Sequence, residues 1–244
     1  MMNFTEGEIL YIDKPLTWTS FDVVNKIRLM LRKHLGIKKI KVGHAGTLDP
    51  LATGLVVVCT GRKTKLIEQL MSHDKEYVAT LRFGQTTPSF DLETQVDAEF
   101  PYEHITREGL QKAIDEYFTG EIDQVPPLFS AIRIDGKRAY EHARKGDQSV
   151  ELKSRRISIS NIEILSFDLP LVTIKINCGK GTYIRSLARD LGTAMNSGAH
   201  LTALRRIKVG DATIDEALTI DDVECLIKQQ TSQKEKLETI IMNI

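Results

Sequence analysis

The spacing of apolar residues predicts a series of strands along this chain. A strand alternates apolar and polar positions when one of its faces is buried, and it is continuously apolar when both faces are buried. Five segments follow one of these patterns: 8–13 (EILYID), 55–60 (LVVVCT), 76–84 (EYVATLRFG), 155–167 (RRISISNIEILSF) and 171–178 (LVTIKINC). The third segment places four residues on one face, namely Tyr77, Ala79, Leu81 and Phe83.

Helical spacing and end residues predict the helices. The clearest one follows residue 19, with Ser20 as its N-cap, Asp22 in its first turn and Gly36 as its stop. Further helices are expected at four places: near 65–71, over 107–118 with Gly120 after it, over 180–195, and over 221–230. Strands and helices alternate without a strict β-α-β rhythm, and several strands follow each other directly. This order favours an α+β fold, with a largely antiparallel mixed β-sheet and flanking helices.

Two segments between these elements are predicted as irregular or short structure. Residues 86–104 are acidic and have no apolar periodicity, so we expect a mobile surface loop there. Residues 130–146 (SAIRIDGKRAYEHARKG) predict a strand, a turn at Asp135-Gly136 and a short helix.

Charge is segregated along the chain although the formal net charge is zero. Residues 14–65 carry eleven Lys and Arg against two acids, a net charge of +9, and residues 175–208 carry seven against one, a net charge of +6. Residues 86–127 carry two against ten, a net charge of −8. If the fold brings the basic stretches to one face, that face attracts phosphates in a salt-dependent way. The alternative is that they are solvated faces of ordinary helices.

The three cysteines, Cys59, Cys178 and Cys225, are far apart and follow no metal-binding spacing. This predicts buried, reduced thiols rather than a disulfide framework or a zinc site. No apolar run is long enough to span a bilayer, and the first residues lack the basic and apolar regions of a secretory signal. We therefore expect a cytoplasmic protein without membrane association.

The stretch GHAGTLDPLATG, residues 43–54, holds one carboxylate, Asp49, between two turns. An aspartate before proline commonly accepts hydrogen bonds from nearby backbone N–H groups, so a structural role is the alternative to a catalytic one. The GHAGT portion lacks the Lys-Ser/Thr of a Walker A loop and the GxGxxG of a dinucleotide fold. A nucleotide-cofactor loop is therefore not expected.

A second unusual stretch, CGKGTYIRSLARDLG at 178–192, predicts an anion site at a helix N-terminus. Two glycines permit a tight exit from the preceding strand, Thr182 can cap the helix, and Tyr183 and Arg185 then fall in its first turn. Such a site binds a phosphate, or a carboxylate from elsewhere in the fold. If Asp49 is buried, it needs such a partner to stay ionised. The alternative is a well-capped surface helix.

Six blocks of the sequence, in order, resemble the bacterial TruB family, the tRNA pseudouridine-55 synthases. They cover about residues 8–210: YIDKPLTWTSFDVV, GHAGTLDPLATGLVVVCTGRKTK, DKEYVATLRFGQTT, QVPPLFSAIRIDGKRAYEHARKG, CGKGTYIRSLARDLG and LTALRR. The agreement of six blocks in identity and order makes the resemblance highly specific.

The resemblance implies a catalytic role for Asp49, which matches the essential aspartate of the GHxGTLDP block. It assigns Tyr77, the tyrosine of the DKxY block, to stacking against the target uracil. Taken alone, a tyrosine or histidine at such positions is more often structural. The histidine of the GHxGT turn, His44, is implied to hold the RNA loop once its bases are extruded.

The resemblance also places three later residues around the pocket. Tyr183 and Arg185 of the KGTYIR block flank it, with the arginine pairing with the catalytic aspartate, and Leu204 before the double arginine lines it. Lys14, from the DKP block, is implied as structural support in the same neighbourhood.

The resemblance implies a pseudouridine synthase fold with a particular domain organisation. Residues 1–210 form the catalytic domain, with an RNA-binding insertion around 84–150. Residues 211–244 form a short, acidic, helical extension, and the C-terminal PUA domain common in the family is expected to be absent. Thr17, where the family usually has glycine, and Gly179, where serine is common, leave the shapes of those loops open.

The activity implied by the resemblance is the isomerisation of uridine to pseudouridine at position 55 of tRNA, by base flipping. Isomerisation needs no group donor or redox equivalent, which agrees with the expectation of no cofactor and no metal. We expect tRNA, through its T-arm, as the partner, no obligatory protein partner and a monomeric chain. A tRNA-binding folding chaperone with secondary catalysis is the alternative function, and a glycoside hydrolase, which needs two carboxylates, is a weaker one.

Overall fold

The computed structural model of the protein describes residues 2–130, 133–134, 137–139 and 152–242. The chain divides into two compact units, each described here by itself. Unit 1 comprises Met1–His73 and Arg205–Ile244, and unit 2 comprises Asp74–Leu204. Within the described part of the chain, no helix combines the length and the apolar character needed to cross a membrane.

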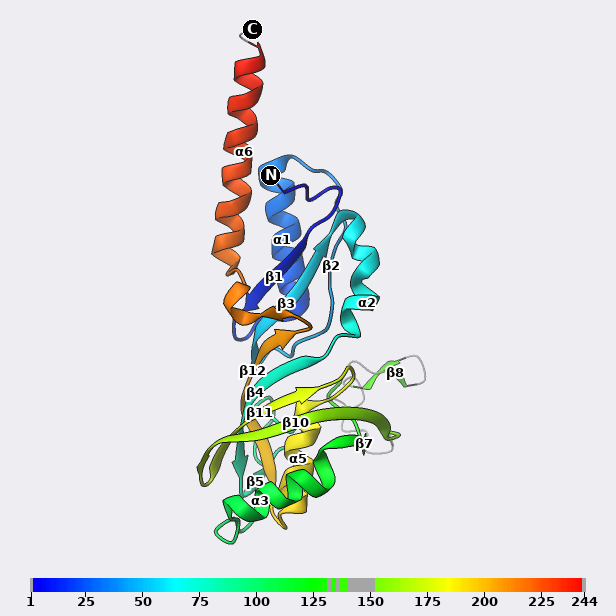
Figure 1. Ribbon diagram of the computed structural model, residues 1–244, viewed down its shortest axis with the longest axis vertical. Coiled ribbons are helices and arrows are strands. Elements are labelled where there is room, and N and C mark those ends of the chain that lie inside the picture. Colours follow the sequence, from blue (N-terminus) through cyan, green and yellow to red (C-terminus); the bar gives the residue numbers. More distant parts are fainter. Residues whose placement is uncertain (1, 131–132, 135–136, 140–151, 243–244) are drawn as a thin grey trace. The chain divides into compact units, whose positions relative to one another are not determined.

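Unit 1 is built on the long buried strand β3. The elements of this unit are β1 (Ile9–Lys14), α1 (Ser20–Leu35), β2 (Val42–His44), β3 (Ala52–Thr60), a 3-10 helix (Gly61–Leu66), α2 (Ile67–Met71), β13 (Ala212–Thr213), a second 3-10 helix (Ile214–Glu216) and α6 (Ile220–Met242). Strands β1 and β2 both pair antiparallel with β3, from Ile9↔Cys59 to Lys14↔Gly54 and from Val42↔Thr60 to His44↔Val58. Helices α1 and α6 lie side by side (Figure 1), where the His34 imidazole and the Glu224 carboxylate approach to 3.5 Å.

Unit 2 is an antiparallel sheet that carries helix α5 on it. Its elements are β4 (Lys75–Phe83), β5 (Gln85–Thr86), β6 (Ala98–Glu99), α3 (Arg107–Ala113) continued by a π-helical turn (Ile114–Phe118), β7 (Gly120–Gln124), β8 (Arg133–Ile134), β9 (Lys137–Arg138), β10 (Arg155–Asp168), β11 (Leu171–Cys178) and α5 (Ile184–Ala194). The strand order β4-β11-β10-β7 is antiparallel throughout. Strand β12 (Ala199–Val209) begins in unit 2 and ends in unit 1.

The fold class predicted from the sequence is confirmed: a mostly antiparallel mixed sheet with flanking helices. All five predicted strands are present, and β4 buries every second residue as its alternation predicts. The predicted helices are present as well, with α6 longer than the segment from which it was predicted. Strands β8 and β9 pair with each other, whereas the Asp135-Gly136 turn and the helix expected after it lie outside the described residues.

The prediction of Ser20 as the N-cap of α1 is wrong by one residue. The cap is Thr19, whose hydroxyl accepts from the backbone N–H of Asp22 at 3.0 Å, while the Asp22 carboxylate accepts from the backbone N–H of Thr19 at 2.8 Å. This reciprocal pair is a capping box. Ser20 is buried instead and contacts the backbone of Leu48. The predicted stop at Gly36 is confirmed, since that residue has the left-handed φ of 63°.

The prediction of Thr182 as the cap of α5 is also wrong. The N-cap is Tyr183, and the Thr182 hydroxyl donates to the carbonyl of Gly179 at 3.1 Å, within the turn that leads to the helix. Arg185 falls in the first turn as predicted.

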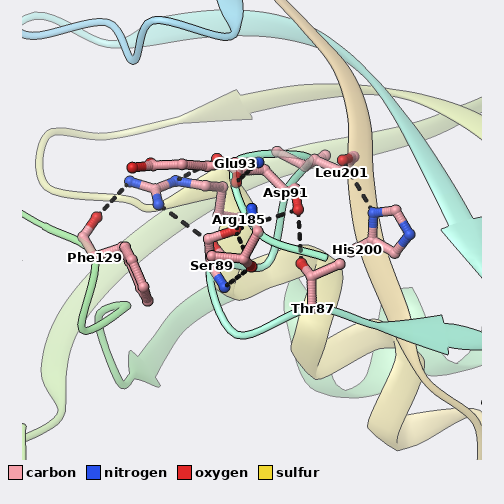
Figure 2. A network of polar contacts seen from close by, with 9 residues as sticks. Thr87, Ser89, Asp91, Glu93, Phe129, Arg185, His200 and Leu201 are labelled. Carbon is pink, nitrogen blue, oxygen red and sulfur yellow. Dashed lines mark hydrogen bonds and ion pairs between the residues drawn. The ribbon is translucent and has the colours of Figure 1, made fainter. Parts of the chain in front are cut away.

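Residues 86–104 are only in part the surface loop that their composition predicts. Most residues of 92–104 are exposed, but the segment is ordered by strand pairing and is partly buried before residue 92. Gln85↔Glu99 and Thr86↔Ala98 pair as a two-stranded ladder, and Thr87, Ser89 and Asp91 between them are buried. The polar groups of this turn satisfy one another: the Asp91 carbonyl accepts from the Thr87 hydroxyl at 2.7 Å, and the Asp91 carboxylate accepts from the Glu93 N–H at 2.9 Å (Figure 2). Polar residues can be buried when their hydrogen bonds are made internally.

The three cysteines are free thiols, as predicted, but only two of them are buried. Cys59 lies in β3 and Cys178 ends β11, whereas Cys225 is exposed on α6. The expectation of a buried thiol is therefore wrong for Cys225, which lies on the solvent side of its helix, while Val223 and Ile227 of the same helix are buried.

Candidate active site

In unit 1, the turn that carries Asp49 connects β2 to β3. Asp49 is half-buried, and its carbonyl accepts from the N–H of Ala52, the first residue of β3, at 3.1 Å. Glycines on either side allow the sharp bends, since Gly46 and Gly54 have φ of 108° and 106°. At Gly54 a Cβ atom would lie 2.2 Å from the Arg206 carbonyl oxygen, so only glycine fits against β12 there.

Lys14 stabilises this turn through hydrogen bonds to backbone carbonyls. Its side chain is fully buried, and its ammonium donates to the carbonyls of Trp18 at 2.6 Å and Pro15 at 3.0 Å and lies 3.5 Å from that of Pro50. Burial lowers the pKa of Lys14 from 10.5 to about 8, a shift that the Asp49 carboxylate opposes and the Arg206 guanidinium reinforces. Lys14 therefore ties the segment after β1 to the residue that follows Asp49.

Arg206 holds the other side of the turn. Its guanidinium is buried, and it donates to three backbone carbonyls: Leu55 at 2.7 Å, Gly46 at 3.2 Å and Thr47 at 3.4 Å. Ser20 adds a two-point contact, because its hydroxyl accepts from the Leu48 N–H at 2.8 Å and donates to the Leu48 carbonyl at 3.3 Å. The backbone on both sides of Asp49 is thus fixed by buried side chains.

His44 ends β2 close to the same turn. It is half-buried, and within the described part of the chain its Nδ1 is buried without a hydrogen-bond partner. Burial lowers the pKa of His44, a backbone contact at Gly46 opposes the shift, and the Arg206 guanidinium adds to it. The lowered pKa favours the neutral imidazole, which can take part in hydrogen bonds.

In unit 2, the predicted site residues lie on two elements. Tyr77 is on β4, 8% exposed, with Ile176 of β11 as its neighbour in the sheet. Tyr183 and Arg185 are at the start of α5. Leu204, the last residue of this unit, is half-buried on β12.

Arg185 connects two segments of unit 2 (Figure 2). Its guanidinium donates to the carbonyl of Ser89 at 3.2 Å and to that of Phe129 at 2.9 Å, and it lies 3.6 Å from the Asp91 carboxylate. Only 5% of the Arg185 side chain is exposed. This carboxylate compensates the buried positive charge within unit 2.

The structure thus gathers Asp49, His44 and Lys14 in unit 1, and it places Tyr183 and Arg185 together in unit 2. The predicted pairing of Arg185 with Asp49 joins residues of the two units and stays a prediction. The roles of the individual residues, the division of the chain at residue 210 and the RNA-binding role of 84–150 stay predictions as well.

Three residues that contact the predicted site were not singled out from the sequence: Arg206, Asp91 and Gln124. Arg206 lay in the LTALRR block, but nothing in its spacing distinguishes a buried arginine from an exposed one. Asp91 is one of five acids in residues 86–104, and nothing in that acidic composition distinguishes a buried carboxylate from an exposed one. In the described residues, no three His, Cys, Asp or Glu side chains are grouped closely enough to hold a metal ion.

Two family models match the chain. The TruB family pseudouridylate synthase N-terminal domain matches residues 32–184, and the tRNA pseudouridylate synthase B C-terminal domain matches residues 185–244. Together they account for all but the first 31 residues.

Curated relatives match over nearly the whole chain. The tRNA pseudouridine synthase B of Phocaeicola vulgatus is 58% identical over 229 residues, which are 94% of this chain and 97% of that protein. That of Parabacteroides distasonis is 54% identical over 235 residues, 96% of this chain and 99% of that protein. That of Cupriavidus pinatubonensis is 48% identical, and the match covers 88% of this chain and 67% of that protein.

Solved structures of larger proteins share the fold. A chain in a crystal structure of a Cbf5-Nop10-Gar1 complex is 28% identical with a TM-score of 0.67, over 91% of this chain and 54% of that chain. A chain in an H/ACA RNP bound to a substrate RNA containing 2'-deoxyuridine is 26% identical with a TM-score of 0.64, over 96% of this chain and 56% of that chain. The chain therefore spans about half the length of these solved chains.

Proposed function

Because the chain belongs to the TruB family of pseudouridylate synthases, we propose that it converts uridine to pseudouridine at position 55, in the T loop of tRNA. The observation that carries the proposal is the identity of more than half with proteins called tRNA pseudouridine synthase B, over nearly the full length of both chains. The held turn around Asp49 supports it, because a reacting carboxylate must be kept in place.

The reaction is an isomerisation, in which the N1 glycosidic bond of uridine breaks and a bond from C5 to the same sugar carbon forms. The atoms of substrate and product balance without a donor, so the proposal includes no cofactor and no metal. We assign Asp49 as the catalytic carboxylate. It attacks the sugar carbon, adds to the uracil ring or starts an elimination through C2′, and these three routes share the same first requirement of an ionised carboxylate beside the nucleoside.

The target uridine must leave the folded RNA loop to reach Asp49. Flipping a base costs roughly a few kcal/mol, and stacking on an aromatic side chain returns about 1 to 3 kcal/mol per base. We assign Tyr77 to stacking against the uracil, with Tyr183 and Leu204 lining the pocket. We assign His44 to hydrogen bonding with the opened RNA loop.

Arg185 is proposed to pair with Asp49 in the assembled site. This adds a function to a guanidinium that already joins Ser89, Phe129 and Asp91 in unit 2. A guanidinium has five donors, so several acceptors can share it. The pairing would favour the ionised form of Asp49 that all three routes require.

The partner in this proposal is tRNA, bound through its T-arm by a monomeric chain without an obligatory protein partner. The basic stretches 14–65 and 175–208 supply phosphate contacts, which makes binding salt-dependent. Since tRNA is made and matured in the cytoplasm, we propose that compartment for the reaction.

The proposal is tested by mapping pseudouridine in unmodified tRNA after incubation with the purified protein and no additive. The expected product is pseudouridine at position 55. Modification at another position would contradict the T-loop assignment, and no pseudouridine in tRNA would contradict the activity.

The role of Asp49 is tested with tRNA tritiated at C5 of uridine, because isomerisation releases that hydrogen. Asp49→Asn keeps the shape of the side chain and is expected to slow tritium release roughly a thousandfold or more, as loss of a nucleophile does in other enzymes. The affinity for tRNA should stay nearly unchanged. The control is Asp211→Asn, which alters an exposed carboxylate of the same unit. Equal rates for the two variants would remove Asp49 from the chemistry.

A further inference from the structure

Gln124 makes a two-point contact with the peptide groups of Tyr183. Its side-chain Oε1 accepts from the Tyr183 N–H at 2.8 Å, and its Nε2 donates to the Tyr183 carbonyl at 3.1 Å. Gln124 is the last residue of β7 and is only 2% exposed. The oxygen and the nitrogen of this buried amide therefore both bond to a single residue of another element.

The contacted residue is the one at which helix α5 begins. Tyr183 is the N-cap, with the extended φ and ψ of −102° and 109°, and its carbonyl also accepts the first helical bond from Leu187 at 3.1 Å. In a capping box, a Gln or Glu of the helix itself reaches back to the N-cap N–H. Here the glutamine that reaches this N–H comes from β7.

Fixing Tyr183 also fixes the direction of the first turn. A helix is a stiff unit, so its axis and the rotation of its side chains are set by the backbone angles at its start. Arg185 lies two residues after the contacted one. A change in the backbone angles of Tyr183 would therefore move both the Tyr183 ring and the Arg185 guanidinium.

Gln124 is itself held by the sheet. Strand β7 pairs antiparallel with β10, and Gln124 is opposite Arg155 at the end of that pairing. The next residues of the chain contact α5. The Val125 carbonyl accepts from the Ser186 hydroxyl at 2.8 Å. The Phe129 carbonyl accepts from the Arg185 guanidinium at 2.9 Å, as Figure 2 shows. Gln124 is the point at which this segment, 124–129, passes from the sheet to the helix.

We propose that Gln124 is a positioning residue for the reaction, acting through the backbone of Tyr183 on the placement of Tyr183 and Arg185. It does not contact the nucleoside. The inference rests on the proposed function, because it assigns an effect on pseudouridine formation. It predicts that the Gln124 amide affects the rate of the bound complex rather than its formation.

The test compares Gln124→Met with Ser186→Ala. Methionine fills a similar volume without hydrogen bonds, so both contacts to Tyr183 are lost. Ser186→Ala removes one hydrogen bond between the same helix and the same segment, and leaves the Tyr183 peptide untouched. Three quantities are measured for each: the single-turnover rate of pseudouridine formation in tRNA, the Kd for tRNA, and the midpoint of thermal unfolding.

Gln124→Met is expected to lower the single-turnover rate about tenfold, the effect of one to two lost hydrogen bonds, with the Kd for tRNA unchanged. Ser186→Ala is expected to lower the unfolding midpoint and to leave the rate near that of the unaltered protein. If Gln124 has only a structural role, Gln124→Met lowers the midpoint of thermal unfolding and leaves the single-turnover rate of the folded protein unchanged. That result overturns the proposal. A weaker Kd for tRNA with an unchanged single-turnover rate overturns it as well.

A double-mutant cycle with Arg185→Lys shows whether Gln124 acts through the first turn of α5. The effect of Gln124→Met should be smaller in the Arg185→Lys background than in the unaltered protein, whereas independent effects would multiply. If Gln124→Met does not fold, Gln124→Glu is used. This variant keeps the volume and the acceptor for the Tyr183 N–H but loses the donor to the carbonyl, and it is also expected to be slower with unchanged Kd.

Failure of this inference is distinguishable from failure of the proposed function. If the unaltered protein forms no pseudouridine in tRNA, the proposed function is wrong. If it does and Gln124→Met or Gln124→Glu forms pseudouridine at the same rate, only the role of Gln124 is wrong.

Discussion

Each unit buries one arginine beside candidate site residues, and the two arginines are held in different ways. In the part of the chain that the structure describes, Arg206 donates to backbone carbonyls, those of Gly46, Thr47 and Leu55. Arg185 donates to two carbonyls from separate segments and also faces the Asp91 carboxylate. Arg206 therefore fixes the shape of one turn, whereas Arg185 joins two segments and retains a carboxylate as its counter-charge.

The two units resemble each other in how they fix the backbone next to a site residue. In unit 1 the buried Ser20 hydroxyl contacts both the N–H and the carbonyl of Leu48, next to Asp49. In unit 2 the buried Gln124 amide does the same at Tyr183. In both units, a buried polar side chain thus fixes the backbone at or next to a proposed site residue.

The largest effect is expected at Arg206, whose buried guanidinium donates to three backbone carbonyls. Arg206→Met should lower the free energy of unfolding by about 4 kcal/mol, because three buried carbonyls lose a charged donor. The measurement is urea denaturation followed by circular dichroism. The rate of pseudouridine formation by the folded variant should fall as well, because the Asp49 turn loses its support.

The adjacent residue on β12 is the matched control. Arg205 pairs with the Asp13 carboxylate at 2.7 and 3.1 Å, but its side chain is 41% exposed. Arg205→Met should therefore cost about 1 kcal/mol or less. Similar losses for the two variants would show that burial of Arg206 among carbonyls has no special weight.

Lys14 gives unit 1 a pH dependence of known sign. Its pKa is about 8 in the folded protein and 10.5 for the ordinary side chain, so between these values the unfolded chain binds a proton that the folded one has lost. The contribution of Lys14 to stability therefore rises with pH across this window and is constant below it. Across the whole window, Lys14 raises the free energy of unfolding by at most about 3 kcal/mol.

The measurement compares the unaltered protein with Lys14→Met by urea denaturation. It covers the range from about pH 7.5 to about pH 10, in which Lys14 titrates. Other groups titrate in both proteins and cancel in the difference. The free energy of unfolding of the unaltered protein, minus that of Lys14→Met, should increase as the pH rises. A flat difference would mean that the buried Lys14 ammonium keeps its ordinary pKa, and a difference that falls with pH would mean that its pKa is raised.

The regular elements could be predicted from the sequence because their causes are local. The alternation in 76–84 reports a face that is buried along its whole length, as β4 shows. The cap of α1 was also predictable: of the two neighbouring hydroxyls, only Thr19 stands three residues before an acid that can close a capping box.

Strand β12 and the 86–104 segment could not be predicted in the same way. In β12 the buried Arg206 interrupts the apolar pattern, and its burial depends on carbonyls more than 150 positions earlier in the sequence. In 86–104 the buried Thr87, Ser89 and Asp91 look like residues of a solvated loop. Their burial depends on each other and on Arg185, which no local pattern contains.

The candidate site shows the same limit. The motifs around Asp49, Tyr77 and Tyr183 can be identified in the sequence because each is a short block of neighbouring residues that resembles a block of the family. The residues that hold them, such as Arg206 and Gln124, act through general hydrogen bonds to backbone. Many residue types can supply such bonds, so only the three-dimensional structure identifies the residues that do.

The smallest of the three effects tests the other arginine. Asp91→Asn keeps the shape of the side chain and an acceptor for the Glu93 N–H, but it removes the carboxylate that faces the Arg185 guanidinium at 3.6 Å. The free energy of unfolding should fall by about 2 kcal/mol, because a buried charged group that loses its partner is left with its desolvation cost. Asp97→Asn, which alters an exposed carboxylate bonded to the Thr86 hydroxyl, serves as the control and should cost less. If Asp91→Asn were as stable as the unaltered protein, Arg185 would need no counter-charge within unit 2, and the contrast between the two arginines would disappear.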